Sequence, residues 1–183
     1  MKNENFVVLT GAMGGGKSTI LKTLFQMATV CVPEPARKIL FEQRSIGASG
    51  VPEIDSGLFT MLMLSRSIHD YNEHEAGQMQ VVFDRGIPDM IAYAELFGLD
   101  LRPYKNAAEQ YRYNDTVFYF PPWEDIYSTD EERKMSFEAA KAFGVRTIQI
   151  YRDLGHTVIE MPFVSIDERV RFVLEKLKEL RTS

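Results

Sequence analysis

The sequence predicts an α/β fold with a five-stranded parallel sheet covered by helices on both faces, and three observations support this prediction. Short apolar runs alternate along the chain with longer segments of helical periodicity, which is the pattern of successive right-handed βαβ units. A glycine-rich stretch at residues 11–18 directly follows the first apolar run. No internal repeat, low-complexity tract or linker interrupts the 183 residues, so a single domain over 1–183 is expected.

The first half of the chain predicts two strands and three helices. Asp55 is a suitable N-cap for a long helix whose apolar stripe extends to Tyr71. A short β-branched run ends at Pro33, where a strand has to stop. The segments expected here are strands at 6–9 and 30–32 and helices at 20–28, 36–47 and 55–71.

The second half predicts three further strands, each followed by a helix. The expected strands are at 80–83, 116–120 and 156–161, and the expected helices are at 87–98, from about 130 to 155, and from 165 onward. Gly144 suggests an interruption of the second helix, and Ser165 with Glu168 forms a capping box at the start of the last. Because ligands of parallel sheets bind beyond the carboxyl ends of the strands, the residues that follow each strand should share one rim.

Residues 11–18 read Gly-Ala-Met-Gly-Gly-Gly-Lys-Ser, which fits the phosphate-binding loop (P-loop) pattern G-x-x-x-x-G-K-[ST] between a strand and a helix. In that setting the backbone N–H groups hold phosphates, Lys17 reaches the β- and γ-phosphate oxygens, and Ser18 ligates Mg²⁺. The alternative is a glycine-rich turn without a ligand, but four fixed positions rarely match by chance. We expect the chain to bind a nucleoside triphosphate. The predicted nucleotide-binding residues are Gly11, Ala12, Met13, Gly14, Gly15, Gly16, Lys17, Ser18 and Thr19.

The composition argues against several other classes of function. The formal net charge is −5 and the basic residues are scattered, which disfavours nucleic acid or an anionic membrane as the main partner. The single cysteine, Cys31, excludes an internal disulfide. No apolar run is long enough to span a bilayer, and the start of the chain does not read as a signal peptide. We therefore expect a cytoplasmic protein without a membrane span.

Asp84 closes the third expected strand, where an acidic residue holds Mg²⁺ in phosphate-loop proteins. The competing interpretation is that Asp84 caps the next helix. It is followed by Arg85, which is placed to reach a phosphate, rather than by the Glu that motor ATPases commonly carry there. The chain also lacks the Asn-Lys-x-Asp stretch of small GTPases. These absences favour a nucleoside or nucleotide kinase that uses ATP.

The acceptor of the phosphoryl group is expected beside Glu34, which follows the second strand between Pro33 and Pro35. The prolines hold Glu34 in an extended turn, from which it can take or orient the proton of an acceptor hydroxyl. The alternative is that Glu34 only interacts with the positive end of the next helix. Arg37 either binds the acceptor or pairs with Glu34, and Trp123 offers a ring for stacking on a base or a nicotinamide-like ring. The predicted acceptor-binding residues are Glu34, Arg37, Arg85 and Trp123.

The segment 123–134 matches, by position, the mobile lid of small kinases. It ends in Glu131-Glu132-Arg133-Lys134, in which Arg133 is the first candidate to cover the γ-phosphate and Lys134 the second. The alternative is a solvated helix start with ion pairs between neighbouring turns. The predicted catalytic residues are Lys17, Glu34, Asp84, Arg85 and Arg133, and the predicted Mg²⁺ ligands are Ser18 and Asp84.

Six features occur in order along nearly the whole chain. They are the loop at 11–18, Glu34-Pro35-Ala36-Arg37, Phe83-Asp84-Arg85-Gly86 with Asp89 and Tyr93, Tyr113 with Val117-Phe118 and Pro121-Pro122-Trp123, Asp130-Glu131-Glu132-Arg133, and Tyr151-x-x-Leu154-Gly155. Together they resemble the NadR-like AAA domain family, which includes the nicotinamide riboside kinase domain of bacterial NAD-regulatory proteins. The resemblance implies a thymidylate-kinase-like five-stranded sheet that binds ATP and Mg²⁺ at residues 14–18, assisted by Asp84, Arg85 and Arg133. It implies less about the substrate, because the family also includes members that only bind nucleotide or regulate.

Two hypotheses from different classes follow. The leading one is an ATP-dependent kinase of a small nucleoside- or nucleotide-like acceptor, with Glu34 as base or orienting group. The alternative is a nucleotide-binding regulatory switch with little or slow ATPase activity, which would act on a protein partner. The substitution Glu34→Gln separates them, because it should cripple a kinase and leave nucleotide-dependent partner binding intact.

Overall fold

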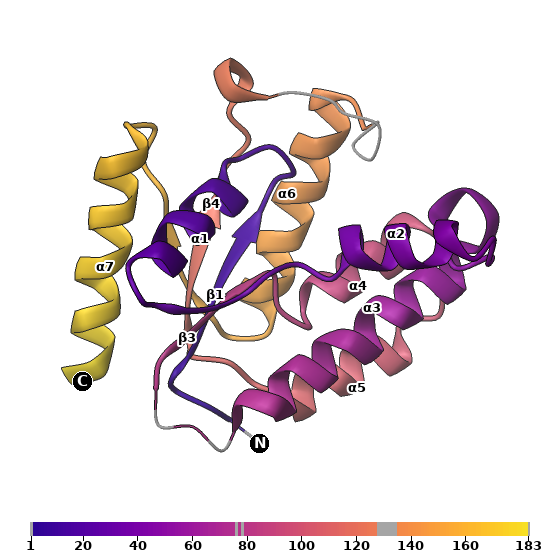
Figure 1. Ribbon diagram of the computed structural model, residues 1–183, viewed down its shortest axis with the longest axis horizontal. Helices are drawn as coiled ribbons and strands as arrows, with labels where there is room; N and C mark the ends of the chain where they lie inside the picture. Colours follow the sequence, from indigo (N-terminus) through magenta and orange to yellow (C-terminus); the bar gives the residue numbers. More distant parts are fainter. Residues whose placement is uncertain (1, 76, 78, 128–134, 183) are drawn as a thin grey trace.

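The structure is a computed structural model that describes residues 2–75, 77, 79–127 and 135–182 (Figure 1). Five strands form one sheet in the order β2-β3-β1-β4-β5, and all neighbouring strands are parallel. The five-stranded parallel sheet predicted from the alternation of apolar runs is thereby confirmed. The strands are β1 (Phe6–Gly11), β2 (Val30–Val32), β3 (Val81–Asp84), β4 (Thr116–Phe120) and β5 (Thr157–Glu160).

Helices cover both faces of this sheet. Figure 1 shows α1 and α7 on one face and the remaining helices on the other. Across the residues that the structure describes, no helix combines the length and apolarity that a membrane crossing requires. The helices are α1 (Lys17–Gln26), α2 (Ala36–Ser45), α3 (Pro52–Glu75), α4 (Asp89–Leu96), α5 (Arg102–Gln110), α6 (Phe137–Asp153) and α7 (Ile166–Thr182).

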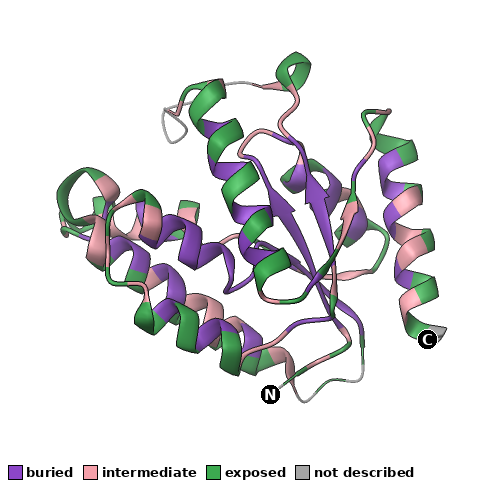
Figure 2. Ribbon diagram, turned by 180° about the vertical axis from the view of Figure 1, so that it is seen from behind, coloured by how far each residue is buried: buried purple, intermediate pink, exposed green. Residues whose placement is uncertain are grey.

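The central strand β1 contributes to two apolar cores. Phe6 and Val8 pack in the core formed with α3, α4, α5 and α6, whereas Val7 and Leu9 pack in the core formed with α1 and α7. All six residues of β1 are buried, which explains why the run from Phe6 to Leu9 is continuously apolar rather than alternating. Figure 2 shows the same arrangement, with buried strands at the centre and exposed outer helix surfaces.

Helix α6 is continuous, so the interruption expected at Gly144 is wrong. It begins at Phe137, where Ser136 Oγ accepts the N–H of Ala139 at 3.2 Å, and not near residue 130. A Cβ on Gly144 would lie 2.9 Å from the backbone of Ala12 in the phosphate loop. Glycine is therefore needed here for close packing of α6 on the loop, and not for a break in the helix.

Of two other helices, one has the predicted cap and the other was missed in the sequence analysis. Helix α3 begins at Pro52, but Asp55 has non-helical angles (φ −144°, ψ 89°) and its Oδ1 accepts the N–H of Leu58 at 2.8 Å. Asp55 thus caps the long part of α3, as predicted. Helix α5 was not predicted from the sequence, and it buries only one narrow stripe that includes Tyr104 and Ala107.

The predicted site residues gather at the carboxyl edge of the sheet. The register pairs Leu9 with Asp84 and Gly11 with Phe120, so the loop after β1 lies between the segments that follow β3 and β4. Glu34 follows β2 at the same edge. The topology thus places the phosphate loop in the middle of the rim, where ligands of parallel sheets bind.

Candidate active site

The phosphate loop connects β1 to α1, and its shape requires glycine. Gly11, Gly14 and Gly16 have φ angles of 123°, 79° and 86°, in the left-handed region that glycine adopts without strain. A Cβ on Gly11 would collide with the carbonyl oxygen of Phe120. Within the described residues, the backbone N–H groups of Gly14 and Gly16 have no acceptor. These donors are available to an anionic ligand.

Three buried cations from different parts of the chain each donate to a carbonyl oxygen of this loop. The pairs are Arg85 with Gly11 (3.1 Å), Lys17 with Ala12 (2.7 Å) and Arg169 with Gly15 (2.9 Å). Because the carbonyl groups are tied to these side chains, the amide groups are free to face the cavity. The cations also add a positive potential. Both effects favour the binding of a phosphate chain.

Lys17 is 5% exposed and carries a perturbed ammonium group. Burial, together with the neighbouring charge of Arg85, lowers the pKa of Lys17 to about 8. Its present acceptor is the neutral carbonyl of Ala12. A phosphate oxygen is a stronger, charged acceptor, so a bound triphosphate would draw the ammonium toward itself.

Ser18 and Asp84 form a pair of oxygen donors beside the loop. Ser18 Oγ donates to Asp84 Oδ2 at 3.0 Å, and Oδ1 of Asp84 is buried without a partner among the described residues. Burial raises the pKa of the Asp84 carboxyl group, an effect that a nearby cation opposes. Hydroxyl and carboxylate oxygens are the ligands that Mg²⁺ prefers, and the orphaned Oδ1 fits such an ion.

The competing interpretation of Asp84 as a helix cap is wrong. The residue before α4 is Pro88, and no side chain caps that helix. The backbone N–H of Gly86 donates instead to Asp89 Oδ2 at 3.0 Å. The carboxylate of Asp84 therefore has no role in starting α4.

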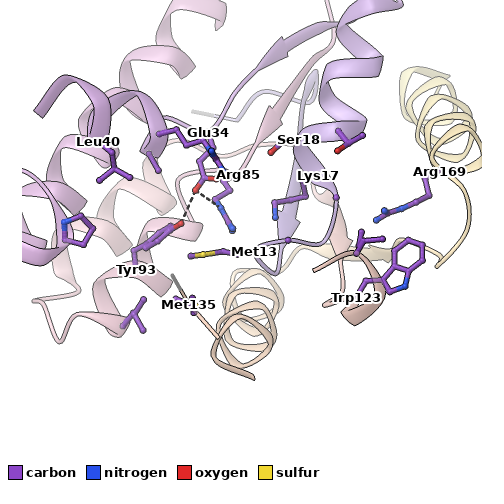
Figure 3. Close-up of a pocket in the computed structure, with 18 of the residues that line it drawn as sticks. Met13, Lys17, Ser18, Glu34, Leu40, Arg85, Tyr93, Trp123, Met135 and Arg169 are labelled. Carbon is purple, nitrogen blue, oxygen red and sulfur yellow. Dashed lines mark hydrogen bonds and ion pairs between the residues drawn. The ribbon is translucent and has the colours of Figure 1, made fainter. Parts of the chain in front are cut away.

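Glu34 is held by two donors that share one of its oxygens. Arg85 Nε and the Tyr93 hydroxyl both donate to Oε1, at 2.8 and 2.9 Å (Figure 3). Oε2 has no partner among the described residues, and the side chain is 24% exposed and lines a cavity. Burial alone would raise the pKa of Glu34, but the charges of Arg85 and Lys17 and the hydrogen bond from Tyr93 outweigh it and lower the pKa. Glu34 thus presents one ionised oxygen to the cavity.

Arg85 is fixed on its other side by Asp89, whose side chain is fully buried. Arg85 Nη1 donates to Asp89 Oδ1 at 2.8 Å. Asp89 also accepts hydrogen bonds from the Thr10 hydroxyl, the Tyr151 hydroxyl and the backbone N–H of Gly86. This network joins β1, α4 and α6 and fixes the arginine that holds Glu34.

A cavity of about 690 Å³ extends over the carboxyl edge of the sheet. Glu34 and Tyr93 lie at one end, Trp123 and Arg169 lie at the other, and Lys17 lies between them (Figure 3). Apolar side chains of α2, α3, α4 and the residue directly after α4 complete the first end, namely Leu40, Phe59, Leu96 and Phe97. The cavity therefore has one end at Glu34 and a second end at Trp123, separated by the phosphate loop.

The structure brings most of the predicted site residues to this cavity. The loop, Glu34, Arg37 and Arg85 line it, and the ion pair of Glu34 is with Arg85. Trp123 also lines it, but at the end away from Glu34. Arg133 and the lid from residue 128 to residue 134 lie outside the described residues.

One residue of the site, Arg169, was not singled out from the sequence, and Tyr93 was named only among the residues that carry the family resemblance, without a role in the site. Asp89 and Tyr93 are four residues apart in α4, a spacing that puts both side chains on one helix face. No local signal marks Arg169, which lies 154 residues from the glycine that it contacts.

Comparison with known proteins identifies the family of this arrangement. The AAA domain family is matched by residues 6–169, which extend from β1 to Arg169 in α7. Among curated proteins, none matches the chain.

Solved structures of kinases share the fold. A deoxyadenosine kinase from M. mycoides with dCMP and dCDP bound superposes with a TM-score of 0.68 at 15% identity, covering 95% of this chain and 99% of that one. A NadR protein in complex with NR gives a TM-score of 0.68 at 18% identity, but this chain spans only 50% of its length and is itself covered to 96%. A thymidylate kinase from Ehrlichia chaffeensis gives 0.61 at 19% identity, with 94% and 97% covered. The fold is therefore that of P-loop nucleoside and nucleotide kinases.

Proposed function

The chain belongs to the AAA domain family that residues 6–169 match, with NadR-like kinases as structural neighbours, and from that premise we propose that it is an ATP-dependent kinase. It transfers the γ-phosphoryl group of Mg-ATP to a hydroxyl group of a small nucleoside-like acceptor. One observation carries this proposal: an ionised oxygen of Glu34, without a partner among the described residues, lines the same cavity as the phosphate loop.

The loop supplies the donor side of the reaction. The free N–H groups of Gly14 and Gly16 bind phosphate oxygens, and Lys17 leaves the Ala12 carbonyl for the β- and γ-phosphates. Ser18 Oγ and Asp84 would hold Mg²⁺, which would supply positive charge beside the phosphates. Among the described residues, no group of three His, Cys, Asp or Glu side chains is arranged to hold a metal ion, so Mg²⁺ at Ser18 and Asp84 would depend on phosphate oxygens and water for its remaining ligands.

Glu34 supplies the acceptor side. Its Oε1 is fixed by Arg85 and Tyr93, so the carboxylate is held in one orientation. The free Oε2 accepts the proton of the attacking hydroxyl. Positioning of the two reactants contributes most to phosphoryl transfer, because the transition state is loose and needs little covalent help.

The proton that Glu34 can take favours a hydroxyl over a phosphate as the attacking group. The free Oε2 of Glu34 can accept the proton of a hydroxyl group. A phosphomonoester at neutral pH attacks through an oxygen that is already mostly deprotonated, so it gains little from a carboxylate base. A neutral hydroxyl also brings no second negative charge beside the carboxylate of Glu34.

The remaining walls of the Glu34 end of the cavity favour a ring. Leu40, Phe59 and Phe97 line it with apolar surface, and Arg37 adds a polar contact at the same end. Binding sites for small molecules typically combine such apolar walls with a few polar groups that orient the ligand. A nucleoside, with a flat base and sugar hydroxyls, fits both parts.

The test is an acceptor panel of nucleosides and their 5′-monophosphates with Mg-ATP, in which ADP release is followed by a coupled assay. We expect one nucleoside to stimulate turnover well above basal hydrolysis, and its monophosphate to stimulate it far less. Lys17→Ala should abolish turnover. Glu34→Gln should lower kcat by about 10²- to 10⁴-fold without weakening ATP binding, measured by calorimetry.

The same panel tests the alternative function. Tight ATP binding without stimulation by any acceptor contradicts the kinase and favours a nucleotide-binding regulatory switch. In that case Glu34→Gln leaves nucleotide-dependent binding of a protein partner unchanged. Stimulation by monophosphates alone would instead contradict the assignment of a hydroxyl acceptor.

A further inference from the structure

Arg169 is a buried cation of α7 that the mechanism above does not use. It is 3% exposed and lines the cavity at the Trp123 end. Its Nη2 donates to the carbonyl oxygen of Gly15 at 2.9 Å. No carboxylate among the described residues pairs with it, and burial alone lowers its pKa.

The burial of Arg169 does not favour stability. Its Nε is buried and has no hydrogen-bond partner among the described residues. A buried cation without a counter-charge, and with an unsatisfied N–H group, costs free energy of folding. An apolar side chain of similar length would pack at the same place without this cost. The charge and the donors of Arg169 therefore need another explanation.

The guanidinium group is wedged between the loop and two aromatic rings. Its carbon Cζ lies 4.8 Å from the ring centre of Phe120 and 5.4 Å from that of Trp123. Its Nη1 lies 2.8 Å from the place where a Cβ of Gly16 would be. Figure 3 shows the side chain pointing from α7 toward the phosphate loop.

The contact with Gly15 acts on one particular peptide unit. The carbonyl of Gly15 and the N–H of Gly16 belong to the same peptide, which is trans, so the two groups point in opposite directions. Glycine on both sides makes this peptide easy to rotate. Holding the carbonyl against Arg169 therefore aims the N–H away from α7, and that N–H has no acceptor among the described residues.

We infer that Arg169 is a positioning residue for the donor triphosphate, which it serves by locking the Gly15–Gly16 peptide with its N–H directed at the phosphates. This inference rests on the proposed donor site at the loop, but not on the identity of the acceptor. If Arg169 has this role, its replacement weakens the binding of any triphosphate, with or without a base, and leaves the KM for the acceptor unchanged.

The experiment compares Arg169→Met, Arg169→Lys and a control, Arg171→Met, in the full chain. Arg171 is exposed and lies two residues away on the same helix. Calorimetry measures the Kd of Mg-ATP and of magnesium tripolyphosphate, which has no base. We expect Arg169→Met to raise both Kd values about tenfold or more, Arg169→Lys to recover part of the loss, and Arg171→Met to change neither.

Thermal unfolding of the ligand-free variants separates positioning from structure. Since methionine removes a buried, unpaired cation, Arg169→Met should be at least as stable as the wild type while it binds triphosphate more weakly. Wild-type affinity of Arg169→Met for tripolyphosphate would overturn the inference, as would a loss confined to Mg-ATP. If Arg169→Met were destabilised, the Arg169→Lys variant would decide between the two roles. A higher KM for the donor with an unchanged KM for the acceptor supports a positioning role of Arg169. Equal rises of the two KM values overturn that role. Failure of the wild type to bind either ligand would overturn the proposed function instead.

Discussion

Unpartnered polar groups mark the site at the scale of single residues. Oε2 of Glu34, Oδ1 of Asp84 and the N–H groups of Gly14 and Gly16 have no partners among the described residues. Asp84 Oδ1 is buried, where polar groups are normally paired, and the other three groups are partly exposed at the same cavity. The Glu34 oxygen can accept a proton, the Asp84 oxygen can bind a cation, and the two N–H groups can donate hydrogen bonds to a phosphate. Their chemistry matches the two sides of a phosphoryl transfer.

Tyr93→Phe tests whether Glu34 is the titrating base. The Tyr93 hydroxyl donates to the charged form of Glu34 and so lowers its pKa. Its removal raises that pKa, and because the base acts when ionised, the acid limb of the kcat profile should move to higher pH. At pH 8, kcat should stay within about tenfold of wild type, since only one hydrogen bond is lost.

The control for this prediction is Tyr104→Phe. Tyr104 is buried in α5, away from the cavity lining, so its hydroxyl should not affect the profile. The measurement is kcat with saturating substrates between pH 4 and pH 8. An acid limb that stays in place in Tyr93→Phe would mean that another group titrates.

At the scale of elements, the sequence predicts structure well where one local pattern dominates. Each strand has a core of consecutive apolar residues and the phosphate loop has fixed residue types, so both were found. Helix α5 has only nine residues and buries only Tyr104, Ala107 and Ala108, and so few apolar positions do not distinguish a short helix from a loop. Gly144 was taken as a break because its actual partner, Ala12, is distant in sequence. Arg169 was missed for the same reason.

Gly144→Ala tests the packing of α6 on the phosphate loop. Alanine normally stabilises a helix interior by about 1 kcal/mol relative to glycine. Here its Cβ would lie 2.9 Å from the backbone of Ala12, and such overpacking costs about 1–3 kcal/mol. We expect a lower free energy of unfolding and weaker triphosphate binding, measured by urea denaturation and calorimetry.

Gly57→Ala is the matched control for this substitution. Gly57 lies in α3, and a Cβ there would come no closer than 3.4 Å to another atom, an oxygen of Asp55. Alanine at this position should leave stability unchanged or raise it slightly. If both variants gained stability and bound triphosphate normally, the proposed contact between α6 and the loop would not limit the site.

At the scale of the whole molecule, the order of the strands assembles one site from distant segments. The cations around the loop are Lys17 at the start of α1, Arg85 after β3 and Arg169 in α7. They converge because β1 is the central strand and its carboxyl end lies in the middle of the rim. Folding of the complete sheet is therefore a condition for binding the donor, and ligand binding should in turn stabilise the entire fold.

This coupling predicts that Mg-ATP raises the melting temperature and that the rise depends on Ser18. A ligand at 100 times its Kd adds about 2.7 kcal/mol to the free energy of unfolding, which for a chain of this size raises the melting temperature by roughly 5–10 °C.

Ser18 and Asp84 are the proposed metal ligands, so EDTA should remove most of this rise in the wild type. Ser18→Ala should show little difference between Mg²⁺ and EDTA. Thr23→Ala, which removes a hydroxyl bonded only to its own helix, should behave as wild type. A rise of equal size with Mg²⁺ and with EDTA in the wild type would contradict a metal site at Ser18 and Asp84.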